Sequence, residues 1–196
     1  HKVLNKLESS TKTTIALTTG LSLGGGLELA LSCDYRIGTR KTQFRFPETN
    51  IGIFPGLGGT QRPARIAGLP AARWAVLAGN FMDARTAADL GLVTDLVDVT
   101  EVDSTISSLD AKGKPAEKYP ATPVNPESKI AKFANSFYSD ENMDTLLNGG
   151  CPDGFDPEDK LVSRQLKSLS RTAPIALRMA SDLIDAAGTT ELMTGL

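Results

Sequence analysis

The first hundred residues alternate short apolar stretches with stretches of helical pattern. Residues 14–18 carry β-branched side chains and predict a buried strand, and residues 27–33 predict a helix that follows a run of glycines. The same pattern predicts a strand at 35–38, a strand that begins at Leu92, and helices at 60–67, 70–78 and 84–90. Asp83 is placed to cap the last helix, and Gly91 to end it in the left-handed conformation. This alternation indicates an α/β fold.

The pattern changes after residue 109. Residues 110–126 are mostly polar and contain four prolines, which predicts a linker or a surface excursion. Beyond it, apolar side chains recur at helical spacing, interrupted by a predicted loop at 149–154. We therefore expect three parts: a core in residues 1–109, a linker at 110–126 and a helical region at 127–196.

The helical region carries apolar side chains that the linker separates from the core. Phe133 and Phe137 share one face of a predicted helix, and Leu183 and Ile184 lie on a longer apolar helix that Gly188 ends. Large exposed apolar surfaces usually mark interfaces. We therefore expect these faces to pack against a neighbouring subunit or against a segment outside this chain.

The composition is that of an ordinary globular protein, with 40% hydrophobic and 22% charged residues. The formal net charge of −2 offers no basic field for nucleic acid, and no apolar run approaches the roughly 20 residues of a membrane span. The start of the chain lacks the apolar stretch of a signal peptide, and two cysteines are too few for a disulfide framework or a thiolate zinc site. We therefore expect a cytoplasmic protein with no metal, no nucleic-acid partner and no membrane partner.

Histidine gives the most useful exclusion. The only histidine in the sequence is His1, at the terminus. Ser–His–Asp triads, Cys–His pairs and metals bound by histidine are therefore all but excluded. Any proton transfer must rest on carboxylates, lysine, tyrosine or cysteine.

The segment at 20–30, GLSLGGGLELA, places glycines directly before a predicted helix. Glycines let a ligand approach the backbone, and the first turn of a helix offers unpaired N–H groups and the positive end of the dipole. Such a loop suits a phosphate, a carboxylate or a developing oxyanion, although a tight turn without a ligand explains the glycines equally well. The loop has neither the Walker A lysine nor the spaced glycines of dinucleotide-binding loops, which disfavours nucleotide phosphates there.

Two glutamates are the candidate acid–base groups. Glu28 falls in the first turn of the helix, where it can simply interact with the dipole, but its apolar neighbours predict partial burial and a need for a partner. Glu48 lies in the segment 46–62, FPETNIGIFPGLGGTQR, and is either a surface carboxylate or another glutamate among apolar groups. If the two carboxylates meet, repulsion raises one pKa and yields an acid and a base at neutral pH. Their spacing of 20 residues does not show that they meet.

Together, the two segments resemble the crotonase superfamily, the enoyl-CoA hydratase/isomerase family, over about residues 14–99. The resemblance implies a spiral of ββα units, of which residues 1–109 form the C-terminal part, assembled as trimers or dimers of trimers. It also implies an acyl-CoA substrate. The helical region, with RTAPIAL at 171–177, resembles the tail of the hydratase part of bifunctional 3-hydroxyacyl-CoA dehydrogenase/enoyl-CoA hydratase proteins. Hydrolases of the superfamily have a comparable tail.

The resemblance also assigns roles to four residues. The backbone N–H of Gly25 aligns with a donor of the oxyanion hole, Glu28 and Glu48 align with the catalytic glutamates that hold the attacking water, and Gly56 aligns with a glycine beside the acyl site. Mitochondrial-type enoyl-CoA isomerases resemble this chain at Glu48 but commonly lack the glutamate at position 28. The 3-hydroxyisobutyryl-CoA hydrolases generally lack it too and carry an aspartate at position 56. The combination in this chain is therefore typical of a hydratase.

The sequence thus favours an enoyl-CoA hydratase, a lyase of fatty-acid β-oxidation that adds water reversibly to trans-2-enoyl-CoA to give 3-hydroxyacyl-CoA. A double-bond isomerase and a thioester hydrolase of the superfamily are the alternatives among enzymes, and an inactive fragment or an assembly module is the alternative outside them. Hydration needs no cofactor, and NAD is expected only with a fused dehydrogenase. Family members have a region before the position of His1 that supplies a second oxyanion N–H and much of the CoA pocket. We therefore expect low activity from residues 1–196 alone.

Overall fold

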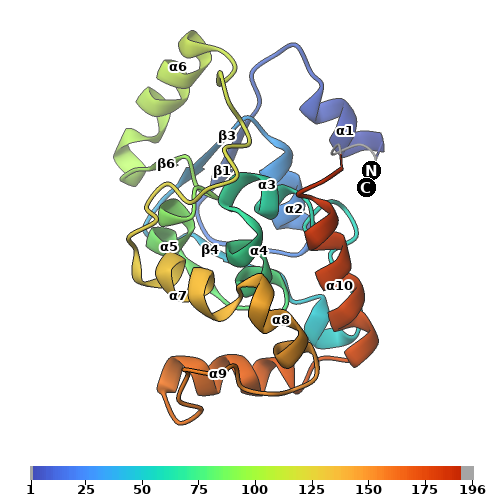
Figure 1. Cartoon of the computed structure of the whole chain (residues 1–196). Coiled ribbons are helices and arrows are strands. Elements are labelled where there is room, and N and C mark those ends of the chain that lie inside the picture. The colour runs from blue at the N-terminus through green and yellow to red at the C-terminus, as the bar shows by residue number, and fades with distance from the viewer. Residues whose placement is uncertain (1, 191–196) are drawn as a thin grey trace.

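The strands form two small sheets in the computed structural model, which describes residues 2–190 (Figure 1). The first sheet has the order β1–β3–β6, with β1 (Ile15–Thr18), β3 (Tyr35–Gly38) and β6 (Asp95–Leu96) all parallel. The second has the order β2–β4–β5, with β2 (Leu21–Leu23) parallel to β4 (Gln43–Arg45) and β4 antiparallel to β5 (Met82–Asp83). Twice the chain runs from the first sheet to the second, and helix α2 (Gly25–Ser32) joins these two ββ passes.

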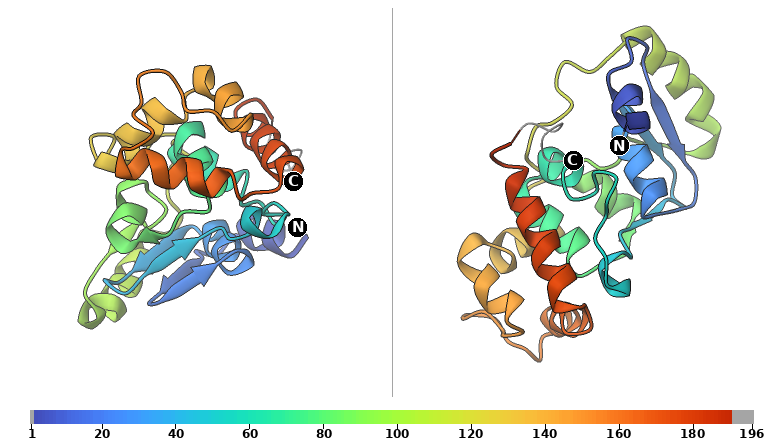
Figure 2. Two further views of the ribbon diagram at one scale, coloured as in Figure 1. Left: turned by 90° about the horizontal axis from the view of Figure 1, so that it is seen from below. Right: turned by 90° about the vertical axis from the view of Figure 1, so that its right-hand side faces the viewer.

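The other helices flank the sheets or form two further layers. They are α1 (Lys2–Glu8), α3 (Arg62–Ala67), α4 (Leu69–Val76), α5 (Ala84–Asp89), α6 (Val102–Lys112), α7 (Lys129–Phe137), α8 (Asp140–Leu147), α9 (Lys160–Leu169) and α10 (Pro174–Ala186), with 3-10 turns η1 (Thr49–Ile51) and η2 (Val99–Glu101). In Figure 2, α3 and α4 lie between the sheets and the layer formed by α7 to α10. Across residues 2–190, no helix combines the length and the apolar character needed to cross a bilayer.

Most of the predicted elements of the first hundred residues are confirmed. The strands at 14–18 and 35–38 and the four predicted helices between 27 and 90 are present with ends shifted by at most two residues. The Asp83 side chain accepts a 2.8 Å hydrogen bond from the N–H of Thr86, and Gly91 has a φ of 80°. Both predicted helix-end signals therefore act as expected.

The strand predicted to begin at Leu92 is wrong. The N–H groups of Leu92 and Val93 both donate to Ala87 O, at 2.8 and 3.1 Å, so these residues fold back on the end of α5. Their apolar side chains are buried there, which explains the apolar signal. Pairing with β3 starts only at Thr94, whose N–H donates to Arg36 O at 2.9 Å, and the strand itself begins at Asp95.

Helix α6, which the sequence pattern did not predict, runs into the start of the predicted linker. Residues 113–128 then form neither helix nor strand. They follow the core closely, because Ala121 N–H donates to Arg65 O at 2.7 Å and Asn125 N–H donates to Asp89 O at 2.8 Å. The three-part division of the chain stays a prediction.

The apolar faces of the helical region are covered by the chain itself. Phe137 on α7 and Ile184 on α10 are both 0% exposed, and Phe133 packs partly buried against the same core. Both helices pack on α4, and three of the six buried residues of α4 are alanines, which allow close approach. The expectation that a neighbour covers these faces is corrected, because α4 supplies the surface that the sequence pattern could not identify.

Candidate active site

Helix α2 begins at two exposed glycines. Gly24, which precedes the helix, has φ 46° and ψ −122°, a conformation that residues with side chains rarely adopt. The N–H of Glu28 donates to Gly24 O at 2.9 Å and makes the first hydrogen bond of the helix. The N–H groups of Gly25 and Gly26 precede this bond and have no acceptor within the helix. They therefore present two donors at the positive end of the helix dipole.

Glu28, one turn into α2, is only 2% exposed. Its Oε1 accepts two hydrogen bonds of 2.7 Å, one from the backbone N–H of Leu57 and one from that of Gly59. A Cβ on Gly59 would lie 3.0 Å from this oxygen and 2.6 Å from Cβ of Pro55, so only glycine brings the loop this close. A carboxylate buried among apolar neighbours needs hydrogen-bond donors, and the backbone of the glycine-rich loop at 55–59 supplies them to Glu28.

Arg62 holds the other side of this loop. The residue is fully buried, and it donates one hydrogen bond of 2.8 Å to Leu57 O and another of 2.8 Å to Oε2 of Glu8 on α1. Leu57 thus gives its N–H to Glu28 and its C=O to Arg62. Neither Arg62 nor Glu8 was predicted from the sequence to have a role. An arginine within an apolar helical stretch was the only available signal, and its partner lies 54 residues away.

The carboxylate of Glu8 is shared among several groups. Besides Arg62, it binds Nζ of Lys118 at 3.0 Å and the hydroxyl of Tyr119. Burial raises the pKa of Glu8, but the hydrogen bonds from Arg62 and Tyr119 and the charge of Lys118 outweigh it and hold the pKa below its ordinary value. Glu8 therefore supplies the negative charge that the buried guanidinium requires.

Glu48 approaches the start of α2 from the other side. It is half-buried at the beginning of η1, and a Cβ on Gly24 would collide with its Oε1. Its Oε2 is buried and has no hydrogen-bond partner in residues 2–190. Burial raises the pKa of Glu48, and the negative charge of Glu28 raises it further. This carboxyl group is therefore biased towards its protonated form and keeps one oxygen available.

The structure brings the four predicted site residues to one end of α2. Glu28 and Glu48 are close enough for one charge to act on the other, and a Cβ on Gly25 would contact Leu57 Cδ1 at 3.7 Å. Gly56, next to Leu57, is exposed, and a Cβ there would meet nothing nearer than 3.9 Å. Such an arrangement places two carboxyl groups beside a helix N-terminus, which suits proton transfer and a developing negative charge.

The elements around the two glutamates expose large apolar side chains. They come from β2, α2, η1 and the loop that follows η1: Leu21, Leu23, Leu29, Ile51, Ile53 and Leu57. Four pockets lie elsewhere in residues 2–190, and neither Glu28 nor Glu48 lines any of them. No cluster of three metal-ligating side chains occurs in this part of the chain either.

The chain is similar to known proteins over the part that contains these motifs. Residues 1–119 match the profile of a family described as Enoyl-CoA hydratase/isomerase. Over 112 residues the chain is 38% identical to the Short-chain-enoyl-CoA hydratase of Clostridium acetobutylicum, a match that covers 57% of this chain and 43% of that protein. Over 114 residues it is 39% identical to the Peroxisomal bifunctional enzyme of Danio rerio, covering 58% of this chain and 16% of that protein.

The fold also matches a solved structure. A crystal structure of an enoyl-CoA hydratase from Rhodobacter sphaeroides superposes with a TM-score of 0.76 and 22% sequence identity, covering 100% of this chain and 56% of that one. This likeness confirms the predicted fold class. The chain thus spans less than two thirds of the length of each of these three proteins.

Proposed function

Because residues 1–119 match its profile, the chain belongs to the enoyl-CoA hydratase/isomerase family, and we propose that it carries the catalytic glutamates of an enoyl-CoA hydratase. The reaction is the reversible addition of water to trans-2-enoyl-CoA, which gives 3-hydroxyacyl-CoA. One observation carries the proposal: Glu28 and Glu48 lie at one helix N-terminus in unlike environments. Two carboxyl groups in unlike surroundings are a common arrangement for acid–base catalysis at neutral pH.

Glu28 is the proposed base. The Leu57 and Gly59 N–H groups hold its Oε1, which fixes the carboxylate and leaves Oε2 for a water molecule. In this role the carboxylate takes a proton from water while the water oxygen bonds to the β-carbon of the substrate. A fixed base of this kind contributes about 10²–10⁴ to the rate.

Glu48 is the proposed acid. Burial and the charge of Glu28 raise its pKa, which favours the protonated form that the role requires. The protonated carboxyl group delivers its proton to the α-carbon as the β-carbon bonds to oxygen. The proton held by Glu28 then returns to Glu48 through solvent, which restores both groups.

The backbone N–H of Gly25 is the proposed oxyanion donor. As water adds, negative charge develops on the thioester oxygen, and a donor at the positive end of α2 stabilises it without reorganising. The loss of one such donor costs on the order of 10²–10³ in kcat. We propose that the second donor comes from a segment outside residues 1–196, and that residues 1–196 alone therefore turn over slowly.

A substrate panel tests the assignment. The full-length protein is assayed with a 2-enoyl-CoA for hydration, a 3-enoyl-CoA for isomerisation and a 3-hydroxyacyl-CoA for thioester hydrolysis. We expect hydration to dominate, and Glu48→Gln to lower it by orders of magnitude while the control Glu141→Gln, an exposed change on α8, leaves it unchanged. If isomerisation or hydrolysis is the main activity instead, the protein is an isomerase or a thioester hydrolase of the family and the proposal is wrong.

Assembly and context are further proposals. We propose a homotrimer or a dimer of trimers in the cytoplasm, with acyl-CoA as the substrate and no nucleic-acid or membrane partner. A fused 3-hydroxyacyl-CoA dehydrogenase, with its NAD, is a further proposal, and the relative from Danio rerio supports a second activity only in that its name calls it bifunctional. Sedimentation of the full-length protein tests the assembly, since a stable monomer near the cellular concentration contradicts it.

A further inference from the structure

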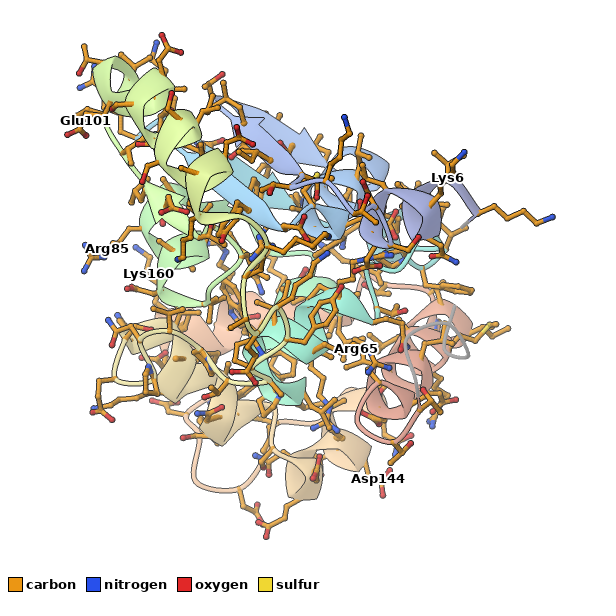
Figure 3. The ribbon with its side chains drawn as sticks, turned by 90° about the horizontal axis from the view of Figure 1, so that it is seen from above. Lys6, Arg65, Arg85, Glu101, Asp144 and Lys160 are labelled. Carbon is orange, nitrogen blue, oxygen red and sulfur yellow. The ribbon has the colours of Figure 1, made fainter. Side chains whose placement is uncertain are left out.

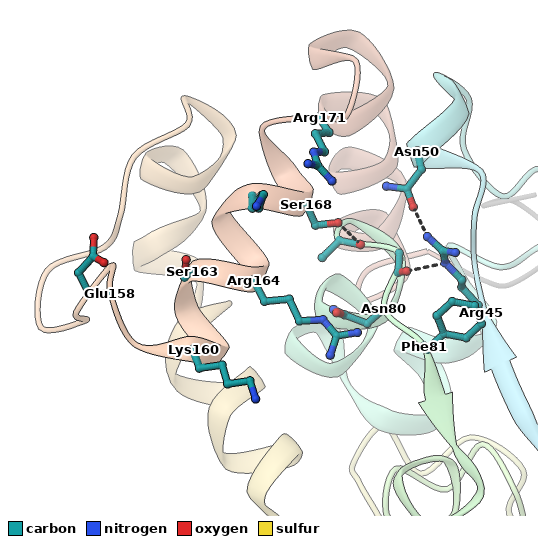
Figure 4. A pocket seen from close by; sticks show the side chains of 13 residues that line it. Arg45, Asn50, Asn80, Phe81, Glu158, Lys160, Ser163, Arg164, Ser168 and Arg171 are labelled. Carbon is teal, nitrogen blue, oxygen red and sulfur yellow. Dashed lines mark hydrogen bonds between the residues drawn. The ribbon is translucent and has the colours of Figure 1, made fainter.

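A hollow lined by cations lies between α9 and the segment 78–81, and neither glutamate of the proposed active site lines it (Figure 4). Its volume is about 770 Å³. The cations that line it are Arg45, Lys160, Arg164, Lys167 and Arg171. Glu158 is the only carboxylate of the lining, and Figure 4 shows it on the side of α9 away from Arg45. None of the five cations forms an ion pair within the described chain.

Three of these cations follow one face of a helix, and a fourth lies just after its end. Lys160, Arg164 and Lys167 stand at i, i+4 and i+7 on α9, and Arg171 follows one turn later. The opposite face of α9, with Val162 and Leu169, is buried, so the cationic face must look outwards. An ordinary solvated face would carry both signs of charge. Here the cationic side chains lie across the hollow from another cation, Arg45, in a chain whose net charge is −2.

Arg45 is fixed in place before any ligand arrives. Its Nε donates to Gly79 O at 2.8 Å, and one terminal nitrogen donates to Oδ1 of Asn50 at 2.9 Å. The guanidinium also lies 4.6 Å from the centre of the Phe81 ring. A planar guanidinium held in this way binds the oxygens of a phosphate without losing much side-chain entropy. Figure 4 shows Arg164 reaching towards Asn80 and Phe81, the same side of the hollow.

A second hollow of about 460 Å³ adjoins the first and shares Asn80, Phe81 and Arg164 with it. Its lining includes five large apolar side chains, Trp74, Phe81, Met82, Ile130 and Leu161, and one carboxylate, Asp83. Trp74 is 4% exposed, and its indole N–H is buried without an acceptor in residues 2–190. A compartment of mixed apolar and polar lining, with an unused donor, therefore lies beside the cationic one. Buried donors of this kind usually find a partner.

We propose that the two hollows form one binding site for a nucleotide with two or more phosphates. The cationic hollow takes the phosphates, and the hollow beside Trp74 takes the flat ring. The volume of each hollow lies in the range of small-molecule sites. A ligand that fills both hollows would give partners both to the cations without ion pairs and to the indole N–H without an acceptor. A free nucleotide and the nucleotide end of a CoA molecule share this chemistry. The overall charge of −2 disfavours an extended nucleic acid, which needs a larger basic surface.

The only tryptophan of the chain provides a direct signal, because it lines the site. The full-length protein is titrated with ADP, ATP, pyrophosphate, adenosine and CoA, with tryptophan fluorescence and calorimetry as readouts and Trp74→Phe to assign the fluorescence. We expect ADP and ATP to bind more tightly than pyrophosphate, adenosine to bind weakly, and the Trp74 signal to change. Arg164→Gln with Lys167→Gln should weaken ADP at least about tenfold, because two charge-assisted contacts are lost.

The matched control removes two cations elsewhere. Lys6→Gln with Lys12→Gln makes the same change of net charge, and Figure 3 shows Lys6 on the opposite side of the molecule from Lys160. This pair should change ADP affinity less than about twofold, since exposed charges beyond a Debye length are screened. If the Arg164/Lys167 variant also loses CoA binding, CoA is the source of the nucleotide. If the variant loses ADP binding but still binds CoA, the ligand is a free nucleotide. The proposal is overturned if ADP does not bind, or if the Arg164/Lys167 and Lys6/Lys12 variants bind ADP equally well. It is also overturned if a short single-stranded RNA binds more tightly than ADP.

Discussion

The backbone N–H of Leu57 donates a 2.7 Å hydrogen bond to Oε1 of Glu28. The C=O of the same residue accepts a 2.8 Å hydrogen bond from the buried Arg62, which in turn pairs with Glu8. One peptide segment thus connects the proposed base on α2 to an ion pair that reaches α1. We infer that Arg62 is a positioning residue, which acts on the proposed chemistry only through the loop at 55–59.

Arg62→Met should lower both stability and turnover. The change leaves the partly buried Glu8 carboxylate with only Lys118 and Tyr119 as partners, so the free energy of unfolding should fall, by less than the roughly 3–5 kcal/mol that a fully uncompensated buried charge costs. It also frees Leu57, so kcat for hydration should fall about tenfold or more while KM changes little. Urea unfolding and steady-state kinetics measure the two effects. If the double change Glu8→Gln with Arg62→Met is no more stable than Arg62→Met alone, the stranded charge is not the cause.

Two glycines of the loop at 55–59 should respond differently to alanine. A methyl group on Gly59 would lie within 3.0 Å of Pro55, Phe46 and Glu28, and such overpacking costs about 1–3 kcal/mol. A methyl group on Gly56 meets only open space, so Gly56→Ala should change stability by less than about 0.5 kcal/mol. Thermal unfolding of the two variants compares them directly. Equal losses would show that the loop does not pack on Glu28 as described.

Glu48 should make stability depend on pH. Its folded-state pKa is raised above the ordinary value of 4.5, by burial first and by the charge of Glu28 second. A raised pKa contributes stability that is present below the unfolded pKa and lost as the pH rises through the folded pKa. Glu48→Gln should therefore have a higher free energy of unfolding than the wild type at pH 7.5, and the difference should vanish below about pH 4. Urea unfolding at the two pH values decides the sign.

Glu8 should behave in the opposite way and serves as the internal comparison. Its pKa is lowered, so its contribution is present above the unfolded pKa and is lost as the pH falls through the folded pKa. Glu8→Gln should destabilise the protein at pH 7.5, and by less at low pH. The assigned environments would be contradicted if the change in free energy of unfolding varied with pH in the same direction for the Glu8 and Glu48 variants.

Phe137→Ala tests whether the helical region belongs to the core of this chain. Phe137 is fully buried and stacks on Phe133 at a ring separation of 5.0 Å, so the truncation should cost about 3–5 kcal/mol. The exposed Val124→Ala serves as the control and should cost little. The loss should be independent of protein concentration. A loss that grows on dilution would place Phe137 at an interface between subunits instead.

The meeting of the two glutamates shows what the sequence could and could not predict. Each motif indicated a carboxylate near apolar groups, but only strand pairing brings them together. Leu23 on β2 pairs with Arg45 on β4, and Gly24 N–H donates to Arg45 O at 3.1 Å. Glu48, three residues after Arg45, is thereby placed over the start of α2. These strands have three residues each, too few for a pattern of alternating side chains to identify them.

Contacts between distant segments explain the remaining differences. The carboxylate that pairs with Arg62 comes from 54 residues earlier in the chain, and no local pattern connects the two. Leu92 carries the apolar signal of a strand, but its N–H is already used by Ala87 O. Phe137 was correctly placed on an apolar helix face, and only the fold shows that α4 covers this face. Local elements follow from the sequence, whereas their partners depend on tertiary packing.

The most direct test of the proposed acid–base pair is a cycle of glutamine substitutions in the full-length protein. Glu28→Gln, Glu48→Gln and the double variant are compared with wild type by the loss of enoyl-thioester absorbance, with binding of the thioester measured separately. We expect each single change to lower kcat by about 10²–10⁴ with thioester binding largely intact. The double variant should lose little beyond the worse single variant, because groups that act as a unit are not additive. Hydration at the wild-type rate by the double variant would contradict the assignment of Glu28 and Glu48.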